Sequence, residues 1–519
     1  LLMKRLFGVH ILKTRPWEHI DKFYRDSFIL TLSNMTTGTI AFVFSILLSR
    51  KLGAEGLGLY GLVMPVYGLL LCVTSDGIIT AISKISTVYF SRREYKNLDR
   101  TLSSMFVLTA LWACTVAMLV LIFHRPLVVY VVRDARASGA LMVLTPALVF
   151  VPLSAIIKGY FYGMGKYRIT ATIDILEKLL RVGVLLTSIA LLKPKSVSGT
   201  VAAAFLALTA GELVSFIALN TCYRIKKSRL KGGTGRIKSR IQLVFDVMVI
   251  SVPLCFNGIV SSVISTVSAL ILPRRLMAAG FTYRDALALI GRFGGMALNI
   301  STLPFIIISS MLTVLVPDVS LNISKKDYWS AEERIAQVMR ISCVIGIATS
   351  IVCFVIPGTL GRVFYQRNDL TAMIRFSAPI CLMTFISSPT FGVLNALGKQ
   401  NILLRNSLIN SLQNLVLTAV LAGIPALNIY GYGLSVIITS ATSLILNTRE
   451  IRKICEIKIG LQDIAIMVFS GTVSWLAALL AGNALLAAPP PARMAGVVIA
   501  CFGTMAAITS YAFKLRAES

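Results

Sequence analysis

Four charged side chains recur at helical spacing in a stretch that is otherwise strongly apolar. They occupy positions i, i+3, i+4 and i+7, so a helix would place them on one face: Asp174, Glu177, Lys178 and Arg181. Such a face supports two kinds of chemistry. In the first, the groups neutralise one another, with Glu177 paired to Arg181; Asp174 would then pair with Lys178. In the second, basic groups bind a phosphate or pyrophosphate, for which arginine is a bidentate donor.

The surrounding sequence makes this charged face unusual. The chain has 519 residues, of which 56% are hydrophobic and 14% are charged. Apolar runs of about 20 residues recur throughout, each long enough to cross a bilayer. They are continuously apolar rather than alternating, which argues against a β-barrel. We therefore expect an all-α polytopic membrane protein with about fourteen transmembrane helices. Arg181 would lie about 13 residues, roughly 20 Å, into its span and near the middle of the membrane.

The predicted spans follow from length and apolarity. They cover residues 27–49, 57–82, 101–123, 139–164, 168–192, 200–222, 243–272, 294–317, 335–356, 369–395, 403–424, 431–448, 462–483 and 492–513.

The net charge of +29 has a membrane explanation. Basic residues gather on the segments that are cytoplasmic if the N-terminus is inside, which predicts that both termini are cytoplasmic. The basic segment 1–26 would then lie on the cytoplasmic surface. The segment 223–240 holds eight basic residues and no acid, as expected of a cytoplasmic linker near anionic lipid. No motif supports a nucleic-acid partner.

An internal repeat divides the chain. Three matches share an offset of 233 residues: Ser91–Tyr95 with Ser324–Tyr328, Pro146 with Pro379, and Gly165–Lys166 with Gly398–Lys399. The repeat predicts two parallel six-helix bundles, 27–222 and 241–455, joined by the linker 223–240. Residues 456–519 would add two further helices. In the second half, the counterparts of the four charged residues are Ser407, Asn410, Ser411 and Asn414, so only the first half carries charge there.

Other charged residues in or near the spans are further candidates, because charge inside a membrane is costly. Those proposed to bind an anionic phosphate or pyrophosphate are Arg181, Lys158, Lys84, Arg274, Arg275 and Arg292. The last three could instead anchor helices at the membrane interface. Those proposed for ion coupling or structural pairing are Asp76, Glu177, Glu212 and Asp174. Three scattered histidines predict no metal site, and we expect no organic cofactor; H⁺ or Na⁺ remains open as a coupling ion.

Several motifs resemble a known family. Arg50–Gly53 followed by Glu55–Tyr60 resembles the first-span exit of oligosaccharide flippases, and Ala81–Lys84 resembles the end of their second span. Lys158–Gly163, with Glu177 and Arg181 downstream, resembles the stage V sporulation protein B family. That family's eighth span is similar to Leu303–Pro304 through Val316–Ser320. It usually has a polar residue such as Gln where this chain has Tyr162.

The resemblance covers nearly the whole chain and implies membership of the multidrug/oligosaccharidyl-lipid/polysaccharide (MOP) exporter superfamily, near the lipid II flippases. It implies the fold of that superfamily, with its two bundles, and a place in the bacterial cytoplasmic membrane. The implied activity is alternating-access movement of an undecaprenyl-pyrophosphate-linked saccharide, a peptidoglycan precursor or polysaccharide repeat unit, to the outer leaflet.

The implied partners are the lipid-linked oligosaccharide, membrane lipid and proteins of cell-wall synthesis, with a monomer favoured. A cation-coupled multidrug exporter of the same superfamily is one alternative. A non-transporting scaffold in sporulation or cell-wall synthesis is another. A lipid-linked sugar ligase would need a sizeable outer loop with acid/base residues, which the sequence does not provide, so no enzyme is expected.

Overall fold

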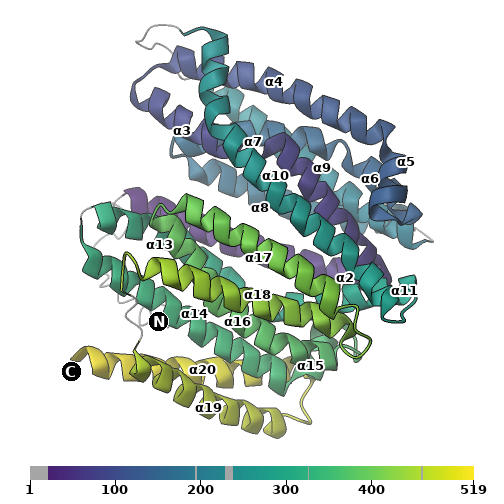
Figure 1. Ribbon diagram of the computed structural model, residues 1–519, viewed down its shortest axis with the longest axis vertical. Coiled ribbons are helices and arrows are strands. Elements are labelled where there is room, and N and C mark those ends of the chain that lie inside the picture. Colours follow the sequence, from purple (N-terminus) through teal and green to yellow (C-terminus); the bar gives the residue numbers. More distant parts are fainter. Residues whose placement is uncertain (1–21, 193–195, 228–237, 325, 457–459, 519) are drawn as a thin grey trace. The chain divides into compact units, whose positions relative to one another are not determined.

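The computed structural model describes residues 22–192, 196–227, 238–324, 326–456 and 460–518, and every element in these ranges is helical (Figure 1). In chain order the elements are α2 (Lys22–Ser75), α3 (Ile78–Ser91), α4 (Tyr95–Ile122), α5 (His124–Pro126), η1 (Leu127–Val132), η2 (Ala135–Ala137), α6 (Ser138–Leu144), α7 (Ala147–Gly163), α8 (Tyr167–Leu192), α9 (Val197–Lys227), α10 (Arg240–Ala278), α11 (Tyr283–Ile290), η3 (Gly291–Ala297), α12 (Leu298–Thr302), α13 (Phe305–Ser324), α14 (Tyr328–Val355), α15 (Pro357–Tyr365), α16 (Thr371–Ala396), α17 (Gln400–Leu421), α18 (Asn428–Ile451), α19 (Leu461–Ala484) and α20 (Pro490–Glu518).

The described helices confirm a multi-pass membrane protein. Ten are long and apolar enough to cross a bilayer, or eleven if the bent pair Tyr283–Thr302 and Phe305–Ser320 forms one span. The exact count of fourteen is not confirmed. One continuous stretch, Thr31–Ser91, covers two predicted spans, and neither α8 nor α17 is among these candidates. The charges on α8 and the amide side chains on α17 lower their hydropathy.

The long first stretch bends at two glycines with left-handed backbone. Gly53 has φ 69° and divides α2 at the end of the first predicted span, so the two merged helices correspond to separate spans. Gly77 has φ 75° and separates α2 from α3. A residue with a Cβ adopts this conformation at a cost, so glycine suits both breaks. The second break leaves Asp76 at the helix junction.

The chain forms two compact units, each described here by itself. One comprises residues 36–295 and 411–432. In it, α7 packs closely on α3 because Gly159 and Gly163 carry no side chain: a Cβ on Gly159 would lie 2.9 Å from the Ile79 carbonyl oxygen. The Thr87 hydroxyl donates to the Gly163 carbonyl at 3.1 Å. Small residues thus allow the two membrane helices to approach closely.

The helix α10 belongs to this same unit, although it follows the predicted linker. Leu243 and Val247 of α10 are fully buried in one apolar cluster with Tyr89, Leu98 and Met105. The compact unit therefore does not end at 223–240, where we placed the boundary between the repeat halves. Residues 228–237 of that linker, and residues 1–21 of the basic N-terminal segment, lie outside the described residues.

The other unit comprises residues 1–35, 296–410 and 433–519, of which 22–35 are the first described. Its centre is the packing of α16 on α14, where the Ser350 hydroxyl donates to the Ala378 carbonyl at 2.8 Å. The two C-terminal helices, α19 and α20, pack on one another and on α14, as expected of an added pair. Asp463 at the start of α19 is buried and lies 3.4 Å from Arg340 Nη2 of α14. This ion pair links α19 to α14 in addition to their packing.

The backbone repeats with the offset read from the sequence. Left-handed residues occur at Arg93 and Lys326, at Arg133 and Gln366, and at Gly165 and Gly398, each pair 233 positions apart. The offset also relates two side-chain contacts: the Ser320 hydroxyl donates to the Ala396 carbonyl at 2.7 Å, as Thr87 does to Gly163. The internal repeat is therefore confirmed at the level of local structure.

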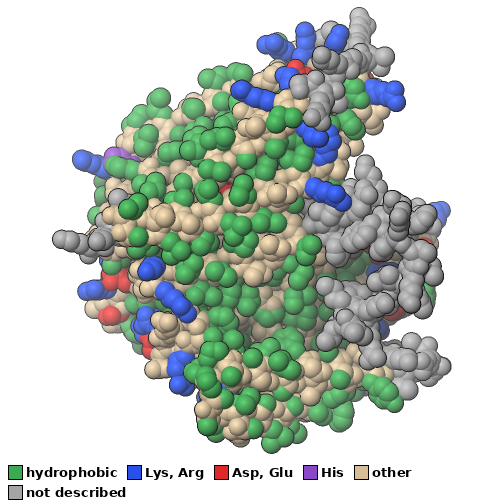
Figure 2. All heavy atoms as spheres, turned by 180° about the vertical axis from the view of Figure 1, so that it is seen from behind, with side chains coloured by type: hydrophobic (Ala, Val, Ile, Leu, Met, Phe, Trp, Pro, Cys, Tyr) green, Lys and Arg blue, Asp and Glu red, His purple; other side chains and the backbone are tan. Residues whose placement is uncertain are grey.

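The surface fits a lipid environment. Hydrophobic side chains cover much of the face in Figure 2. Large apolar side chains are widely exposed, among them Leu111, Trp112 and Met118 of α4 and Phe469 and Leu480 of α19. A hydrocarbon solvent tolerates such exposure, whereas water would not.

Candidate functional site

The four charged residues of α8 lie on one helix face, as their spacing predicts, and two neighbouring helices complete the group. Lys158 comes from α7 and Glu212 from α9. The group thus holds three acids and three bases within one compact unit. We call it the charged cluster: Lys158, Asp174, Glu177, Lys178, Arg181 and Glu212.

Arg181 is the centre of this cluster. Its Nη2 atom lies 2.5 Å from Glu177 Oε1 and 3.0 Å from Glu212 Oε1. The side chains are 13%, 5% and 18% exposed, in that order. One guanidinium therefore bridges two carboxylates on different helices. The i,i+4 pairing of Glu177 with Arg181 is confirmed. The link from Arg181 to Glu212, for which the sequence suggested no particular partner, is an addition.

The lysines pair differently from our prediction. Asp174 binds Lys158 of α7, at 2.7 Å between Oδ1 and Nζ, and not Lys178 of its own helix. Lys178 instead lies 2.7 Å from Glu177. The prediction of an Asp174–Lys178 pair was wrong because helical spacing considers only neighbours on the same helix. Because α7 and α8 are joined by a short turn, Lys158 of α7 comes within reach of Asp174.

One hydrogen-bond donor inside the charged cluster has no acceptor in the part of the chain that the structure describes. The Nε of Arg181 is buried and has no hydrogen-bond partner among the described residues. Gly211 of α9 makes room for the group, since a Cβ there would lie 2.9 Å from Glu177 Oε1. Because the three positive charges equal the three negative ones, the cluster is charge-balanced and does not have the excess of basic groups that the sequence suggested. Ion pairing is what makes this much buried charge tolerable.

Two tyrosines of α2 accompany the cluster and were missed by the sequence analysis. Tyr67 is 5% exposed, and both Tyr60 and Tyr67 lie within electrostatic range of Arg181. The Tyr60 ring also stacks on Phe205 of α9, with centroids 4.7 Å apart. Tyr60 ends a motif used for the family resemblance, but its closeness to α8 and α9 depends on tertiary packing that spacing does not reveal.

The turn that leads into α8 carries a further basic group. Gly165 has φ 67°, and Lys166 N–H donates to the Phe161 carbonyl at 2.9 Å, which closes the end of α7. Partial burial, together with Lys226, lowers the pKa of Lys166. This lysine is therefore easier to neutralise than a free one, and it lies outside the paired cluster.

The other basic candidates do not join the cluster. Lys84 is exposed on α3, and Arg274 is exposed on α10. Arg275 lies against Gly423, whose Cβ, if present, would be 2.8 Å from Arg275 Nε. The Arg292 Nε donates to the Ala288 carbonyl of the preceding turn at 3.3 Å. The sequence analysis placed these four basic residues in one group with Arg181 because of their charge. In the structure they lie apart from the charged cluster, on α3, α10 and η3.

Asp76 is also separate from the cluster. It borders a cavity of about 350 Å³ at the junction of α2 and α3. Its Oδ1 accepts a hydrogen bond from the Gly77 N–H at 3.0 Å.

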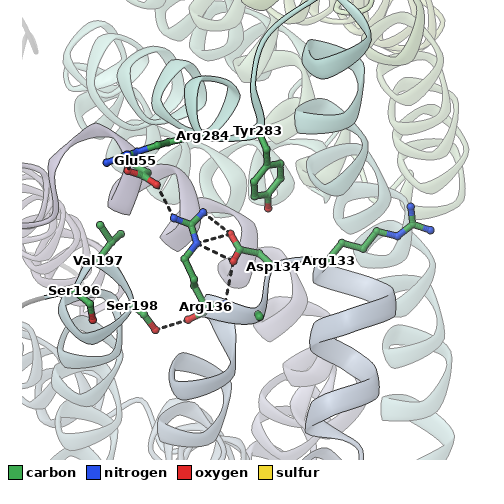
Figure 3. A pocket seen from close by; sticks show the side chains of 10 residues that line it. Glu55, Arg133, Asp134, Arg136, Ser196, Val197, Ser198, Tyr283 and Arg284 are labelled. Carbon is green, nitrogen blue, oxygen red and sulfur yellow. Dashed lines mark hydrogen bonds and ion pairs between the residues drawn. The ribbon is translucent and has the colours of Figure 1, made fainter.

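A third charged region went unnoticed in the sequence. A cleft of about 670 Å³ is lined by Glu55 of α2, by residues 133–136, by 196–198 and by Tyr283 and Arg284 of α11 (Figure 3). Arg136 is held by Asp134 at 2.8 Å and by Glu55 at 2.6 Å. The other oxygen of Glu55 lies 2.8 Å from Arg284 Nε. Glu55 thereby links Arg136 to Arg284, which are about 150 residues apart in the chain. In the sequence analysis Glu55 appeared only as part of the family motif Glu55–Tyr60.

Comparison with known proteins decides the family. The profile of a family described as "Polysaccharide biosynthesis protein" matches residues 23–322, more than half of the chain. The chain belongs to this family. It is 27% identical to stage V sporulation protein B of Bacillus subtilis (strain 168) over 458 residues, 87% of this chain and 88% of that protein. It is 20% identical to the lipid II flippase MurJ of the same organism over 425 residues, 76% of this chain and 77% of that one.

Solved structures show the fold. An inward-facing multidrug resistance MATE family transporter of the MOP superfamily matches with a TM-score of 0.61 and 14% identity, over 81% of this chain and 95% of that one. A MOP superfamily transporter from Pyrococcus furiosus, described as having a binding pocket of reverse polarity, matches with 0.58 and 14% identity, over 82% and 96%. The expected MATE-like, all-helical fold is confirmed.

Proposed function

We propose that this protein is a flippase for an undecaprenyl-pyrophosphate-linked saccharide in the bacterial cytoplasmic membrane, working by alternating access. The single observation that carries the proposal is the buried arginine bridge, Arg181 with Glu177 and Glu212, on membrane helices of a polysaccharide biosynthesis family protein. A relative named as a lipid II flippase supports a lipid-linked substrate.

The charged cluster suggests how an anionic headgroup would be handled. Without substrate, the carboxylates compensate Arg181, so the membrane interior holds no net charge. A pyrophosphate is negatively charged, like the carboxylates of Glu177 and Glu212, and it can accept two hydrogen bonds from the guanidinium. It could therefore replace these carboxylates as the partner of Arg181. The binding energy therefore depends on exchanging ion pairs rather than on a permanently positive cavity. Such exchange favours release after transport, because the acids recapture the arginine.

The remaining basic candidates have proposed places before and after this exchange. Lys158, in the cluster, would contact the headgroup together with Arg181. Lys84 would contact the headgroup near the cytoplasmic side of the membrane. At the outer side, the headgroup would be contacted by Arg274, Arg275 and Arg292. These assignments rest on the orientation predicted from loop charge. The lipid tail would remain in the bilayer, next to the exposed apolar side chains of the helices.

The direct test is translocation of a fluorescent undecaprenyl-pyrophosphate saccharide in vesicles containing the purified protein. Arg181→Ala should slow transport about tenfold or more, since it leaves two buried carboxylates without their partner. Arg181→Lys should recover part of the transport rate, because lysine restores the positive charge but not the bidentate hydrogen-bond geometry of the guanidinium group. Arg375→Ala is the matched control: this arginine is exposed and stacks on Phe354 in the other unit. Unchanged transport by monodisperse Arg181→Ala would remove Arg181 from the mechanism.

A cation-coupled multidrug exporter is the second candidate, and one observation favours it. Three acids balance the basic groups of the cluster, so the site is not exclusively suited to anions. In the same vesicles, an exporter would move cationic drugs and lose that activity in Glu212→Gln. Transport of neither substrate class would instead favour a scaffold in sporulation or cell-wall synthesis.

A further inference from the structure

The turn between α7 and α8 carries a basic pair that lies outside the charged cluster. Lys166 belongs to this turn, and Lys226, near the end of α9, lies within electrostatic range of it. One apolar cluster joins Met164 and Ile169, on either side of the turn, to Tyr223 of α9, which brings the end of α9 beside the turn. No ion pair to either lysine occurs among the described residues. Two like charges are therefore held together without an acid to compensate them.

An acid in the same region is already occupied. Asp99 of α4 lies 2.5 Å from Lys227 Nζ and accepts a hydrogen bond from the Tyr223 hydroxyl at 3.2 Å. Partial burial and the neighbouring Lys226 both lower the pKa of Lys166. An anion bound between the two lysines would oppose this effect, because it favours the charged form of both amines. The basic pair is therefore suited to a negatively charged ligand.

Two aromatic rings meet across the same turn. Tyr162 lies at the end of α7 and Tyr167 begins α8; their ring centroids are 5.6 Å apart and their planes are inclined by 32°. Both side chains are half-buried. Such rings provide large apolar faces with a polar hydroxyl at one edge, and the C–H face of a sugar ring packs on surfaces of this kind. Aromatic faces beside two lysines match a sugar that carries phosphate.

The equivalent turn of the second half keeps the geometry but has no aromatic rings. The counterparts of the two tyrosines, 233 positions further on, are Asn395 and Gln400. The Gln400 Nε2 donates to Asn395 Oδ1 at 2.8 Å, so these side chains also meet across the turn. Gly398 has φ 69°, and the counterpart of Lys166, Lys399, is exposed. The aromatic pair thus belongs to the half that carries the charged cluster.

The aromatic pair also lies next to that cluster. Tyr162 follows Lys158 by four residues on α7, which is about one helical turn or roughly 6 Å along the axis. It lies within electrostatic range of both Lys158 and Asp174. The orientation predicted from loop charge places the turn on the cytoplasmic side. We call the group at this turn the turn site: Tyr162, Lys166, Tyr167 and Lys226.

We propose that the turn site is an entry site for the pyrophosphate-linked saccharide, occupied before the headgroup reaches Arg181. This inference rests on the proposed function, because it names where the same substrate first binds. The two lysines increase the association rate, since charge complementarity steers an anion toward them. The tyrosine rings contact the sugar and so favour a saccharide-linked pyrophosphate over other phosphate-bearing lipids. Ion-pair exchange at Arg181 determines the affinity after entry.

Lysine footprinting tests occupation of the turn site. Purified protein in neutral-lipid nanodiscs is acetylated with and without a water-soluble, short-chain prenyl-pyrophosphate saccharide, and mass spectrometry measures the modification of each lysine. The probe should protect Lys166 and leave Lys399 unprotected. In Arg181→Gln, where exchange at the charged cluster is disabled, Lys166 should still be protected. Phosphatidylglycerol in place of the probe separates the two sources of phosphate; equal protection by this lipid would overturn the assignment to the saccharide.

Association kinetics test the roles of the side chains. The double variant Lys166→Gln with Lys226→Gln should slow association of the probe about tenfold at low salt and less at high salt, with little change in dissociation. Lys399→Gln is the matched control and should bind as the wild type does. Tyr162→Gln should lose the preference for the saccharide-linked over the saccharide-free prenyl pyrophosphate, whereas Tyr162→Phe should keep it.

Transport in vesicles distinguishes failure of this inference from failure of the proposed function. If the wild type transports the saccharide but Lys166 is unprotected and the double variant associates normally, the entry site alone is overturned. If the wild type does not transport it but Lys166 is protected, the flippase is refuted and the entry site stands. Should the double variant not fold, the footprint of the wild type and the single variant Lys226→Gln decide.

Discussion

Two equivalent parts of the repeat differ sharply in how they hold polar groups inside the membrane. In α7, α8 and α9, the group is ionic and centres on Arg181. In α16, α17 and α18, a chain of neutral amides replaces it: Asn406 Nδ2 donates to Asn447 Oδ1 at 2.9 Å, and Asn447 Nδ2 donates to Thr390 Oγ1 at 3.0 Å. Ion pairs thus connect the three helices in the first half, and hydrogen bonds between neutral side chains connect the equivalent three helices in the second half.

The difference teaches which half can respond to a charged substrate. A neutral amide network costs less to bury and does not change when an anion approaches. An ion-paired network is expensive, but it can exchange partners with a phosphate. The second half keeps its ion pairs at one end of α17, where Arg405 is 54% exposed and binds Glu450 at 3.0 Å. We infer that the first half handles the headgroup and that the second half serves mainly as a structural counterpart.

The largest effect on stability should come from breaking the ionic network. Glu177→Ala leaves Arg181 and Lys178 without a shared partner in a buried place, which should lower the free energy of unfolding by about 3 kcal/mol. Asn410→Ala, at the equivalent position of α17, removes an Oδ1 that has no hydrogen-bond partner among the described residues and should cost less than about 1 kcal/mol. Unfolding in mixed micelles, followed by circular dichroism, compares the two. Equal losses would refute the contrast.

A second comparison concerns the equivalent helix crossings. Gly163→Ala should destabilise the protein by about 1–3 kcal/mol, because the added Cβ would lie 2.5 Å from the Ser83 carbonyl oxygen of α3. The counterpart of Gly163 is Ala396, so that crossing already accommodates a methyl group. Ala396→Gly should cost only about 1 kcal/mol, from helix propensity. Thermal unfolding of both variants measures this, and tolerance of Gly163→Ala would show that the α3–α7 contact relaxes.

A third comparison, of a buried with an exposed ion pair, includes the smallest expected energy. A double-mutant cycle on Arg181 and Glu212 should give a coupling energy of about 1–3 kcal/mol, because both side chains are mostly buried. The same cycle on Arg405 and Glu450 should give about 0.5 kcal/mol, since that arginine is half exposed. Stability in 1 M NaCl provides a check: screening should reduce the second coupling and leave the first nearly unchanged. Similar values would mean that both pairs are hydrated.

Much of this contrast could be predicted from the sequence. The offset of 233 residues, the helical face of α8 and the neutral counterparts on α17 all follow from spacing along the chain. What spacing could not supply was contact between helices. Asp174 binds Lys158 of α7, and Glu212 of α9 completes the bridge to Arg181. Nor could it show that α10 packs with the first-half helices, because burial of Leu243 and Val247 depends on tertiary packing.

The most direct measurement of the central claim is binding of undecaprenyl pyrophosphate by native mass spectrometry to two matched variants, Arg181→Gln and Asn414→Gln. These positions are equivalent in the repeat, and both substitutions introduce the same neutral side chain. The account predicts that Arg181→Gln weakens binding about tenfold or more, whereas Asn414→Gln binds as the wild type does. Equal affinities for the two variants, or a greater loss in Asn414→Gln, would contradict the assignment of the headgroup to the first half.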